Sequence, residues 1–333
     1  MARVALDLLG GDGAPEAVAD AVALLHAERP GIDLVLVGPS DLSGLLAERG
    51  IDPDGLRWLP ATGAVPMADA ALELVRADCG RDAAALTVTV AARAVRAGAA
   101  DALVSVGHTG ACVAASVLTL GRITGMSRPA LAVVLPALHH PVVLVDAGAS
   151  LDATPSTLLQ FALAGYSYAR TLGVAEPTVG LLSIGHEPGK GDALRRSADP
   201  VLRERLAEAG IPYAGNVEGH DVADGRRAQV VVTDGFTGNV LLKGIEGTVS
   251  WAAARIGATY GDPGPARHLM HAVATGDFAG GMLLGVDGVA VVGHGAGTAQ
   301  EIAACVRLAA RAADEGIVQL TRAAFDRIVL AGA

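Results

Sequence analysis

Short apolar runs alternate with longer amphipathic stretches along the whole chain, and most of the runs end in a polar or glycine-rich turn. Runs rich in Val, Leu and Ile that alternate with helical patterns are typical of an α/β protein. The pattern predicts strands at residues 4–9, 34–37, 102–105, 131–135, 142–145, 178–184, 230–233 and 289–292. It predicts helices at 15–28, 41–49, 84–97, 113–121, 157–172, 297–313 and 317–330. We therefore expect a three-layer α/β/α sandwich around a mainly parallel, mixed sheet.

One connection breaks this alternation. The strands at 131–135 and 142–145 are joined by a short proline-flanked segment that is too short for a helix, which predicts an antiparallel hairpin. A chain of 333 residues exceeds what one small core needs, so the sequence predicts one large domain over 1–333 or two intertwined subdomains. Residues 260–279, which contain GDPGPA and TGDFAGG, are predicted to form a flexible or helical insertion.

Composition narrows the class of protein. Hydrophobic residues make up 51% of the chain and aromatic residues only 3%, so the core is expected to consist of Val, Leu, Ile and Ala. The formal charge of −10 argues against a nucleic-acid partner, which needs a basic face. The chain starts with a strand-like run, has no basic signal region, and contains no clean membrane span. The expected location is therefore the cytoplasm.

The three cysteines, Cys79, Cys112 and Cys305, are scattered and form no CxxC pair. This usage indicates a reducing compartment, without a disulfide framework or a zinc site. Cys112 follows a glycine-rich turn, so it could be a nucleophile or a small buried side chain, and the second reading is favoured.

Six polar or glycine-rich segments end predicted strands or open predicted helices. Several such loops at one sheet edge would form a cleft lined by backbone N–H groups, which can hold phosphate without a metal. The segments are DLLGGD (7–12), SVGHTG (105–110), DAGAS (146–150), SIGHEPGKG (183–191), TDGFTGN (233–239) and HGAG (294–297).

The segment at 229–242, QVVVTDGFTGNVLL, is the most informative of these regions. A buried strand delivers Thr233, Asp234, Thr237 and Asn239 to its carboxyl end, where ligands bind in open α/β sheets. Taken alone, the segment fits an ordinary strand followed by an Asp/Gly turn equally well.

Three cationic or titratable side chains stand in these loops. Lys190 lies in a glycine turn and could neutralise a phosphate or an oxyanion, although an ordinary exposed lysine fits the spacing as well. His108, which precedes a predicted helix, and His294, which follows a strand, could each donate to an anion or act as a base. A solvent-facing turn histidine explains both of them equally well.

The sequence contains no motif for nucleotide binding, metal binding or a serine nucleophile. GHEPGKGD does not have the spacing of a phosphate-binding Walker loop, and no GxGxxG follows the first strand. No His, Asp and Glu residues have metal-ligand spacing along the chain, and no GxSxG elbow occurs. We therefore expect no metal and no cofactor, and direct attack by a bound inorganic nucleophile suits these residues better than a covalent enzyme intermediate.

Taken together, the segments resemble the phosphate acyltransferase family (PlsX) in order and spacing over nearly the whole chain. The matching motifs are ALDxMGGDxAP at 5–15, SxGxTGA at 105–111, RPALAxxLP at 128–136, DxGA at 146–149, LLQFAxxG at 158–165, GLLSIGxExxKG at 180–191, GNVEGxD at 215–221, VVVTDGFTGNVLLKxxEG at 230–247 and GGxLLGVxGVxVxxHG at 280–295.

The resemblance implies a fold similar to phosphotransacetylase and to isocitrate and isopropylmalate dehydrogenases. It implies transfer of an acyl group from acyl carrier protein to inorganic phosphate, for phospholipid synthesis, by a homodimer. The weak hydrophobic character of residues 260–279 predicts a membrane contact that is peripheral and weaker than is usual for the family. By matching position, Lys190 and Asn239 are the expected catalytic residues. The expected substrate- or phosphate-binding residues are Gly10, Gly11, Asp12, Gly107, His108, Thr109, Gly110, Asn216, Asp234 and His294.

Several positions depart from the family motifs. His108 replaces a usual Asn, Ser150 replaces another Asn, Gly297 replaces Ser, and residues 77–82 replace a Lys- and Ser-rich run. These departures keep two alternatives open. One is an acyltransferase of the same fold with a different thioester or acceptor in a specialised pathway, and the other is a non-catalytic protein that binds carrier protein or acts as a scaffold.

Overall fold

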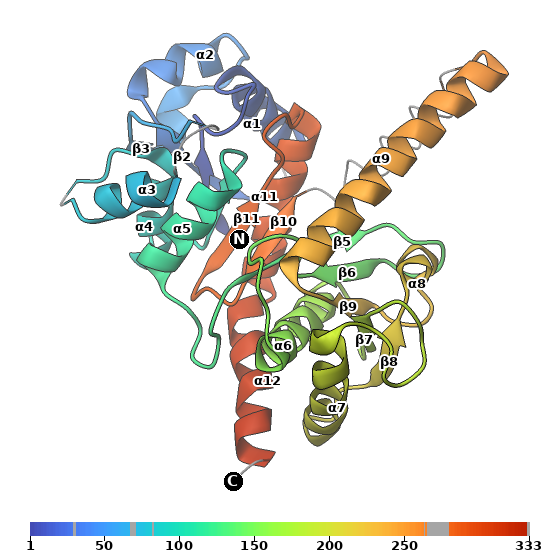
Figure 1. The fold of residues 1–333 in the computed structure, drawn as a ribbon. Helices are drawn as coiled ribbons and strands as arrows, with labels where there is room; N and C mark the ends of the chain where they lie inside the picture. Colours follow the sequence, from blue (N-terminus) through green and yellow to red (C-terminus); the bar gives the residue numbers. More distant parts are fainter. Residues whose placement is uncertain (29–30, 67–70, 82, 263, 265–279, 332–333) are drawn as a thin grey trace. The chain divides into compact units, whose positions relative to one another are not determined.

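The computed structural model describes residues 1–28, 31–66, 71–81, 83–262, 264 and 280–331 (Figure 1). The chain divides into two compact units, and each unit is built from two separate segments of the sequence. Unit 1 comprises Met1–Ile123 and Ala279–Val318, whereas unit 2 comprises Thr124–Phe278 and Gln319–Ala333. Each unit is described here by itself.

The sheet of unit 1 has the strand order β3-β2-β1-β4-β11-β10. Adjacent strands are parallel, except that β10 and β11 are antiparallel. Because β1, β4 and β11 are parallel neighbours, their carboxyl ends lie at the same edge of the sheet. The strands are β1 (Arg3–Asp7), β2 (Asp33–Gly38), β3 (Arg57–Pro60), β4 (Ala102–Ser105), β10 (Gly281–Leu284) and β11 (Val289–Val292).

Two groups of helices flank this sheet. Helix α4 packs on β1, β2 and β4 with α5 beside it, and α11 packs on β4 and β11 with α1 beside it. A capping box between Thr298 and Glu301 starts α11 and satisfies its first backbone N–H groups. The helices are α1 (Glu16–Glu28), α2 (Ser43–Ala47), α3 (Ala71–Cys79), α4 (Thr87–Arg96), α5 (Thr109–Leu120) and α11 (Ala299–Asp314), with 3₁₀ turns at Ser40–Leu42 and Pro53–Gly55.

The sheet of unit 2 has the strand order β5-β6-β9-β7-β8. β5 and β6 are antiparallel and the other neighbours are parallel, so the carboxyl ends of β6, β9, β7 and β8 share one edge. The strands are β5 (Ala130–Leu135), β6 (Val142–Val145), β7 (Val179–Leu182), β8 (Tyr213–Val217) and β9 (Val230–Val232).

Helices α6 and α7 cover the sheet of unit 2 side by side. α6 lies close to its strands because Gly165 has no side chain: a Cβ there would be 2.8 Å from Cγ1 of Val230 and 2.9 Å from Cγ1 of Val145. The helices are α6 (Pro155–Thr171), α7 (Ala193–Glu208), α8 (Gly219–Asp224), α9 (Gly235–Tyr260) and α12 (Ile317–Ala331). No helix in the described ranges combines the length and the apolar character needed to cross a membrane.

The predicted architecture is confirmed. A mixed, mostly parallel sheet with flanking helices is present, and the antiparallel hairpin pairs Ala132 with Val145 as expected. The predicted strands at 102–105 and 142–145 coincide with β4 and β6. Of the predicted insertion at 260–279, residues 263 and 265–279 lie outside the described part.

Of the two readings that the sequence left open for 233–239, the ordinary Asp/Gly turn does not hold. The strand β9 ends at Val232, and the glycine-rich segment that follows is the first turn of the 26-residue helix α9. Asp234 is the residue before the helix, and its side-chain oxygen accepts a hydrogen bond from the backbone N–H of Thr237 at 2.9 Å. An N-cap of this kind, rather than a turn, therefore accounts for the Asp at this position.

Candidate active site

Three of the six predicted loops meet at the carboxyl edge of the unit 1 sheet. The backbone N–H of Asp12 donates to the carbonyl of Gly295 at 2.7 Å, which joins the first loop to the last. A Cβ on Gly10 would lie 2.8 Å from the nitrogen of Gly107, and Gly11 has a φ of +95°. Only glycine allows these loops to approach so closely, and Gly11 also needs its positive φ.

A buried carboxylate fixes this part of the edge. Asp7 is 3% exposed and ends β1, where it accepts hydrogen bonds from Oγ of Ser105 at 2.7 Å and from the N–H of Leu9 at 3.0 Å. Burial raises the pKa of Asp7, and hydrogen bonds from Thr87 and Ser105 counteract this only in part. Asp7 therefore connects the loop at 7–12 to the loop at 105–110 through buried hydrogen bonds.

The two loop histidines of unit 1 each accept a hydrogen bond from a backbone N–H group of their own loop or of the helix that follows it. His108 is the N-cap of α5, and its Nδ1 accepts from the N–H of Ala111 at 3.4 Å. Nδ1 of His294 accepts from the N–H of Ala296 at 3.3 Å. In a neutral imidazole with Nδ1 as acceptor, the proton is on Nε2. Each ring can thus present an N–H donor to an anion.

The other three loops meet at the carboxyl edge of unit 2. Asp146, which is fully buried at the end of β6, organises the first of them. Its two carboxylate oxygens accept five hydrogen bonds of 2.8–2.9 Å, from the N–H groups of Leu131, Gly148, Ala149 and Ser150 and from the Ser150 hydroxyl. Ser150, where the family motif has Asn, thus takes part in holding this loop.

Two glycines at the start of α9 let the helix sit directly on that loop. A Cβ on Gly238 would lie 1.9 Å from the carbonyl oxygen of Asp146, and one on Gly235 would lie 2.2 Å from that of Ser150. Nδ2 of Asn239 completes the contact by donating to the carbonyl of Ala147 at 3.1 Å. The glycines of TDGFTGN are therefore required by close backbone approach.

We expect Gly238→Ala to destabilise the protein by about 1–3 kcal/mol, because the new Cβ forces α9 away from the loop at 146–150. Urea unfolding measures the change. Gly244→Ala in the same helix is the matched control, since a Cβ there meets nothing within 4 Å. Alanine at position 244 should stabilise by about 0.5–1 kcal/mol, and equal behaviour of the two variants would contradict the prediction.

A buried arginine joins the second loop of this edge to the third. Arg195 is 6% exposed, and its Nη2 donates to Oδ2 of Asp234 and, at 2.7 Å, to Oγ1 of Thr233. Its Nε donates to the carbonyl of Leu182 at 3.1 Å, and Nη1 pairs with Asp192 at 3.0 Å. Burial works to raise the pKa of Asp234, but hydrogen bonds from Thr237 and Arg195 outweigh it, so this pKa lies below its usual range.

The loop after β7 carries the one predicted catalytic cation. Lys190 is exposed, and no hydrogen bond or ion pair engages its ammonium group among the described residues. The neighbouring Asn216, at 2% exposure, donates through Nδ2 to the carbonyl of Glu187 at 3.0 Å, whereas its Oδ1 is buried without a partner in the described part of the chain. A buried acceptor without a partner costs free energy, so Oδ1 of Asn216 is available to accept a hydrogen bond from a donor beside the Lys190 loop.

Comparisons with known proteins decide the family. The family model described as fatty acid synthesis protein matches residues 2–320. A phosphate acyltransferase from Thermobifida fusca is 42% identical over 322 residues, covering 91% of this chain and 86% of that protein. A phosphate acyltransferase from Desulfitobacterium hafniense is 36% identical and covers 99% of both chains. The chain belongs to the phosphate acyltransferase family.

The fold of this acyltransferase is also that of a solved phosphotransacetylase. The structure from Streptococcus pyogenes covers 96% of this chain and 94% of its own, with a TM-score of 0.64 and 17% sequence identity. The predicted likeness to the phosphotransacetylase fold is confirmed.

The acyltransferase structure sorts the predicted site residues into two groups. Unit 1 brings together Gly10, Gly11, Asp12, Gly107, His108, Thr109, Gly110 and His294. Unit 2 brings together Lys190, Asn216, Asp234 and Asn239, with Asn216 bonded to the Lys190 loop and Asn239 bonded to the loop at 146–150. Asp234 faces Arg195 and its own helix rather than open solvent.

Three side chains that shape these edges were not singled out from the sequence: Asp7, Asp146 and Arg195. The two aspartates stand at the head of predicted loop segments, which was the only available signal. Arg195 sits in an unremarkable Arg-Arg pair, and its role depends on contacts with residues 13 and more positions away. Nothing in local sequence distinguishes it from the exposed Arg196.

Two other features of the acyltransferase lie apart from these loops. Burial raises the pKa of the Cys112 thiol to about 12, which agrees with a small buried cysteine and not with a thiolate nucleophile. Unit 2 also contains an open cavity of about 650 Å³ at the start of α6. It includes none of the predicted site residues and is lined by Gly125, Thr154, Pro155, Ser156, Leu159, Gln160, Leu163, Val201, Arg205 and Phe325.

Proposed function

We propose that this acyltransferase moves the acyl group of an acyl carrier protein thioester onto inorganic phosphate. The family match over residues 2–320 carries the proposal. The buried, protonated Cys112 thiol supports direct attack by phosphate over a covalent intermediate on this cysteine.

The reaction needs no redox step and no covalent enzyme intermediate. A phosphate oxygen attacks the thioester carbonyl carbon, and the carbonyl electrons move onto its oxygen. When the tetrahedral species collapses, the carbon–sulfur bond breaks, and the thiolate takes up the proton that phosphate carried. The products are an acyl phosphate and the carrier thiol.

Lys190 is proposed to stabilise the oxyanion of the tetrahedral species. Its ammonium is exposed and unengaged among the described residues, so it is available for a substrate. Asn216 supports the loop that carries Lys190 through the carbonyl of Glu187. Asn239 is the second proposed catalytic residue: its amide lies at the N-terminal turn of α9, where backbone N–H groups favour negative charge.

The remaining predicted residues are proposed to hold substrate oxygens. In unit 1 the donors would be loop N–H groups and Nε2 of His108 and His294, and in unit 2 Asp234 would keep the start of α9 in place. Holding phosphate against the carbonyl supplies much of the rate enhancement, because it replaces a bimolecular encounter by a positioned attack.

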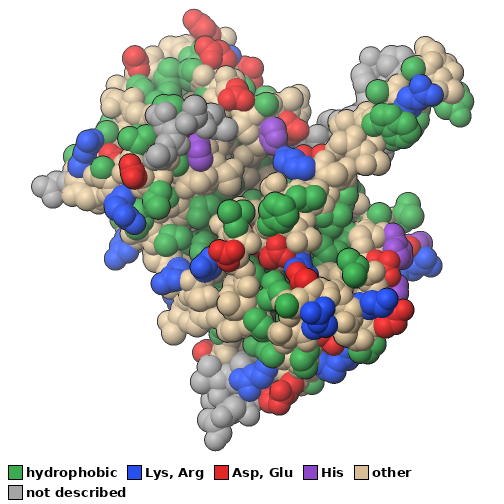
Figure 2. All heavy atoms as spheres, in the orientation of Figure 1, with side chains coloured by type: hydrophobic (Ala, Val, Ile, Leu, Met, Phe, Trp, Pro, Cys, Tyr) green, Lys and Arg blue, Asp and Glu red, His purple; other side chains and the backbone are tan. Residues whose placement is uncertain are grey.

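We further propose a cytoplasmic homodimer with weak peripheral contact to the inner membrane face. The support is α9, which extends away from the sheet of unit 2 and keeps large apolar side chains exposed (Figures 1 and 2). Phe236, Trp251 and Tyr260 are 63%, 66% and 77% exposed. Light scattering measures the dimer, and liposome flotation at low and high salt measures the membrane contact.

The proposed activity is tested by incubating the purified protein with acyl carrier proteins of several chain lengths and labelled phosphate. We expect labelled acyl phosphate to form in step with the release of carrier thiol. If acyl phosphate forms only with a different thioester, that thioester and not acyl carrier protein is the acyl donor. Binding of the carrier without product at any chain length would overturn the proposal in favour of a non-catalytic binding protein.

A further inference from the structure

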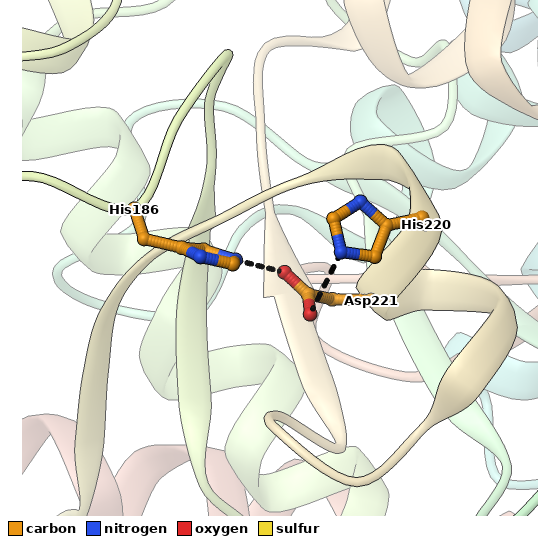
Figure 3. A group of neighbouring side chains, drawn as sticks. All are labelled: His186, His220 and Asp221. Carbon is orange, nitrogen blue, oxygen red and sulfur yellow. Dashed lines mark hydrogen bonds and ion pairs between the residues drawn. The ribbon is translucent and has the colours of Figure 1, made fainter.

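At the carboxyl edge of unit 2, His186 meets His220 and Asp221, which follow it by 34 and 35 positions in sequence (Figure 3). His186 lies in the loop after β7, and His220 and Asp221 lie in the first turn of α8. One ligand atom from each residue lies within 4.8 Å of the others. Spacing along the chain predicted no metal ligands because this set forms only when β7 and β8 pair.

The atoms that face inward are suitable ligands. Nε2 of His186 is 2.6 Å from Oδ2 of Asp221, and Nε2 of His220 is 3.7 Å from Oδ1 of the same carboxylate. Ligand atoms around a tetrahedral zinc ion, at bonds of about 2.1 Å, lie roughly 3.4 Å apart. The observed separations bracket that value, so modest side-chain rotations would close the set on an ion.

A second carboxylate occupies the outer positions of both rings. Glu218 lies 4.0 Å from Nδ1 of His186 and 3.5 Å from Nδ1 of His220, on the opposite ring nitrogens from those that face Asp221. In zinc sites a ligating histidine usually donates its other ring N–H to a carboxylate, which fixes its tautomer and orientation. The cluster thus contains both an inner set of ligands and the outer partner that such sites use.

Asp221 can serve a metal without giving up its structural role. Its Oδ2 accepts from the N–H of Glu218 at 2.8 Å and so caps α8, which leaves the other lone pair of Oδ2, on the side of His186, and both lone pairs of Oδ1 for coordination. The His186 and His220 side chains are 38% and 67% exposed, so an ion can reach them.

We propose that His186, His220 and Asp221 bind one divalent transition-metal ion of the zinc class. Imidazole nitrogens select zinc, cobalt, nickel or copper over magnesium and calcium, which prefer oxygen ligands. Three protein ligands leave a position for water or for an anion. Figure 2 shows histidine side chains on the surface over α8, where this ion would bind.

The ion would tie the Lys190 loop to α8. His186 is four positions before Lys190, and the same loop is already held by Asn216 at the end of β8. A bound ion adds a further point of attachment and places positive charge beside the loop. The metal binding stands independently, whereas any effect on turnover rests on the proposed function.

The test uses the full chain without a histidine tag, treated with chelator and dialysed. We expect Co²⁺ to bind with one ion per chain and to give the visible absorption of a low-symmetry, tetrahedral site, and Zn²⁺ to displace it. His186→Asn with His220→Asn should weaken Zn²⁺ binding by at least about 100-fold, and Glu218→Gln by about 10-fold, as expected for an outer partner. Mg²⁺ should not compete.

His139→Asn is the matched control, because His139 is another exposed histidine of unit 2 beside an aspartate, Asp224. Asp221 is left unchanged because it caps α8, and circular dichroism verifies the fold of each variant. Zn²⁺ binding that survives in the double variant, or a chain that takes up no Zn²⁺ at micromolar concentration, would overturn the proposal. Both readings use binding alone, so they are independent of whether the protein transfers acyl groups.

Discussion

Replacing Lys190 by Ala should lower kcat/KM for acyl transfer to phosphate by about 10²–10³-fold, the usual cost of removing one oxyanion donor. The exposed ammonium has no structural partner among the described residues, so we expect the free energy of unfolding to change by less than about 0.5 kcal/mol. The loss should appear mainly in kcat, because the charge on the carbonyl oxygen develops only in the transition state. Steady-state kinetics with acyl carrier protein and phosphate, together with urea unfolding, measure both quantities.

The chain offers a matched control, since it contains only two lysines. Lys243 lies on α9, where it pairs with Glu246 at 2.8 Å on the surface, and Lys243→Ala should leave kcat/KM nearly unchanged. Lys190→Arg keeps the charge with a different shape and should recover part of the rate. Equal rates for Lys190→Ala and the wild type would remove Lys190 from the chemistry while leaving the family assignment untouched.

Replacing Arg195 by Met should destabilise the protein by about 3–5 kcal/mol, the cost of leaving a buried charge without its partner. The variant leaves Asp234 without the guanidinium, and Oγ1 of Thr233 and the carbonyl of Leu182 lose their donors as well. Urea unfolding measures the loss. Arg196→Met at the neighbouring, exposed position should cost less than about 0.5 kcal/mol.

The pH dependence of the free energy of unfolding is a second test of the interaction between Arg195 and Asp234. The pKa of Asp234 is lowered in the folded protein, so its stabilising contribution is complete above the unfolded value of about 3.9 and is lost as pH falls toward the folded value. In Arg195→Met the folded pKa should rise toward the unfolded value, so the acid-induced loss from Asp234 should be smaller and should be complete at higher pH. Adding Asp234→Asn to Arg195→Met should recover part of the stability at neutral pH, and strictly additive losses would contradict the coupling.

The strands that were predicted well from the sequence are those buried on both faces. β4 and β6 are continuous apolar runs with buried residues throughout, so their limits could be read directly. β3 and β8 are edge strands with exposed or half-buried positions, and their sequences RWLP and YAGNV show no apolar run. α7 was missed because it is polar and contains Pro200, which is usually a sign of a helix end.

The candidate site was predictable only as a set of loops. A polar segment after an apolar run gives its position at a strand end, and glycine spacing marks the close contacts of Gly10 and Gly238. The partners within the site depend on which strands are neighbours, and that order is not encoded locally. Arg195 reaches Asp234 because β7 and β9 are adjacent, and His186 meets His220 because β7 and β8 are. The departures at His108 and Ser150 proved to be loop anchors in the folded chain.

The strand order of unit 1 has a consequence for biosynthesis. β11 pairs with β4 near the middle of this sheet, yet residues 106–288 must be made between them. At typical rates of synthesis of about 5–20 residues per second, the edge of β4 waits roughly 10–40 s for its partner. During that time one edge of a strand that is fully buried in the finished fold is open to pairing with other chains, a recognised route to aggregation. Unit 2, whose strands all lie between Ala130 and Val232, completes its sheet within one continuous stretch of translation.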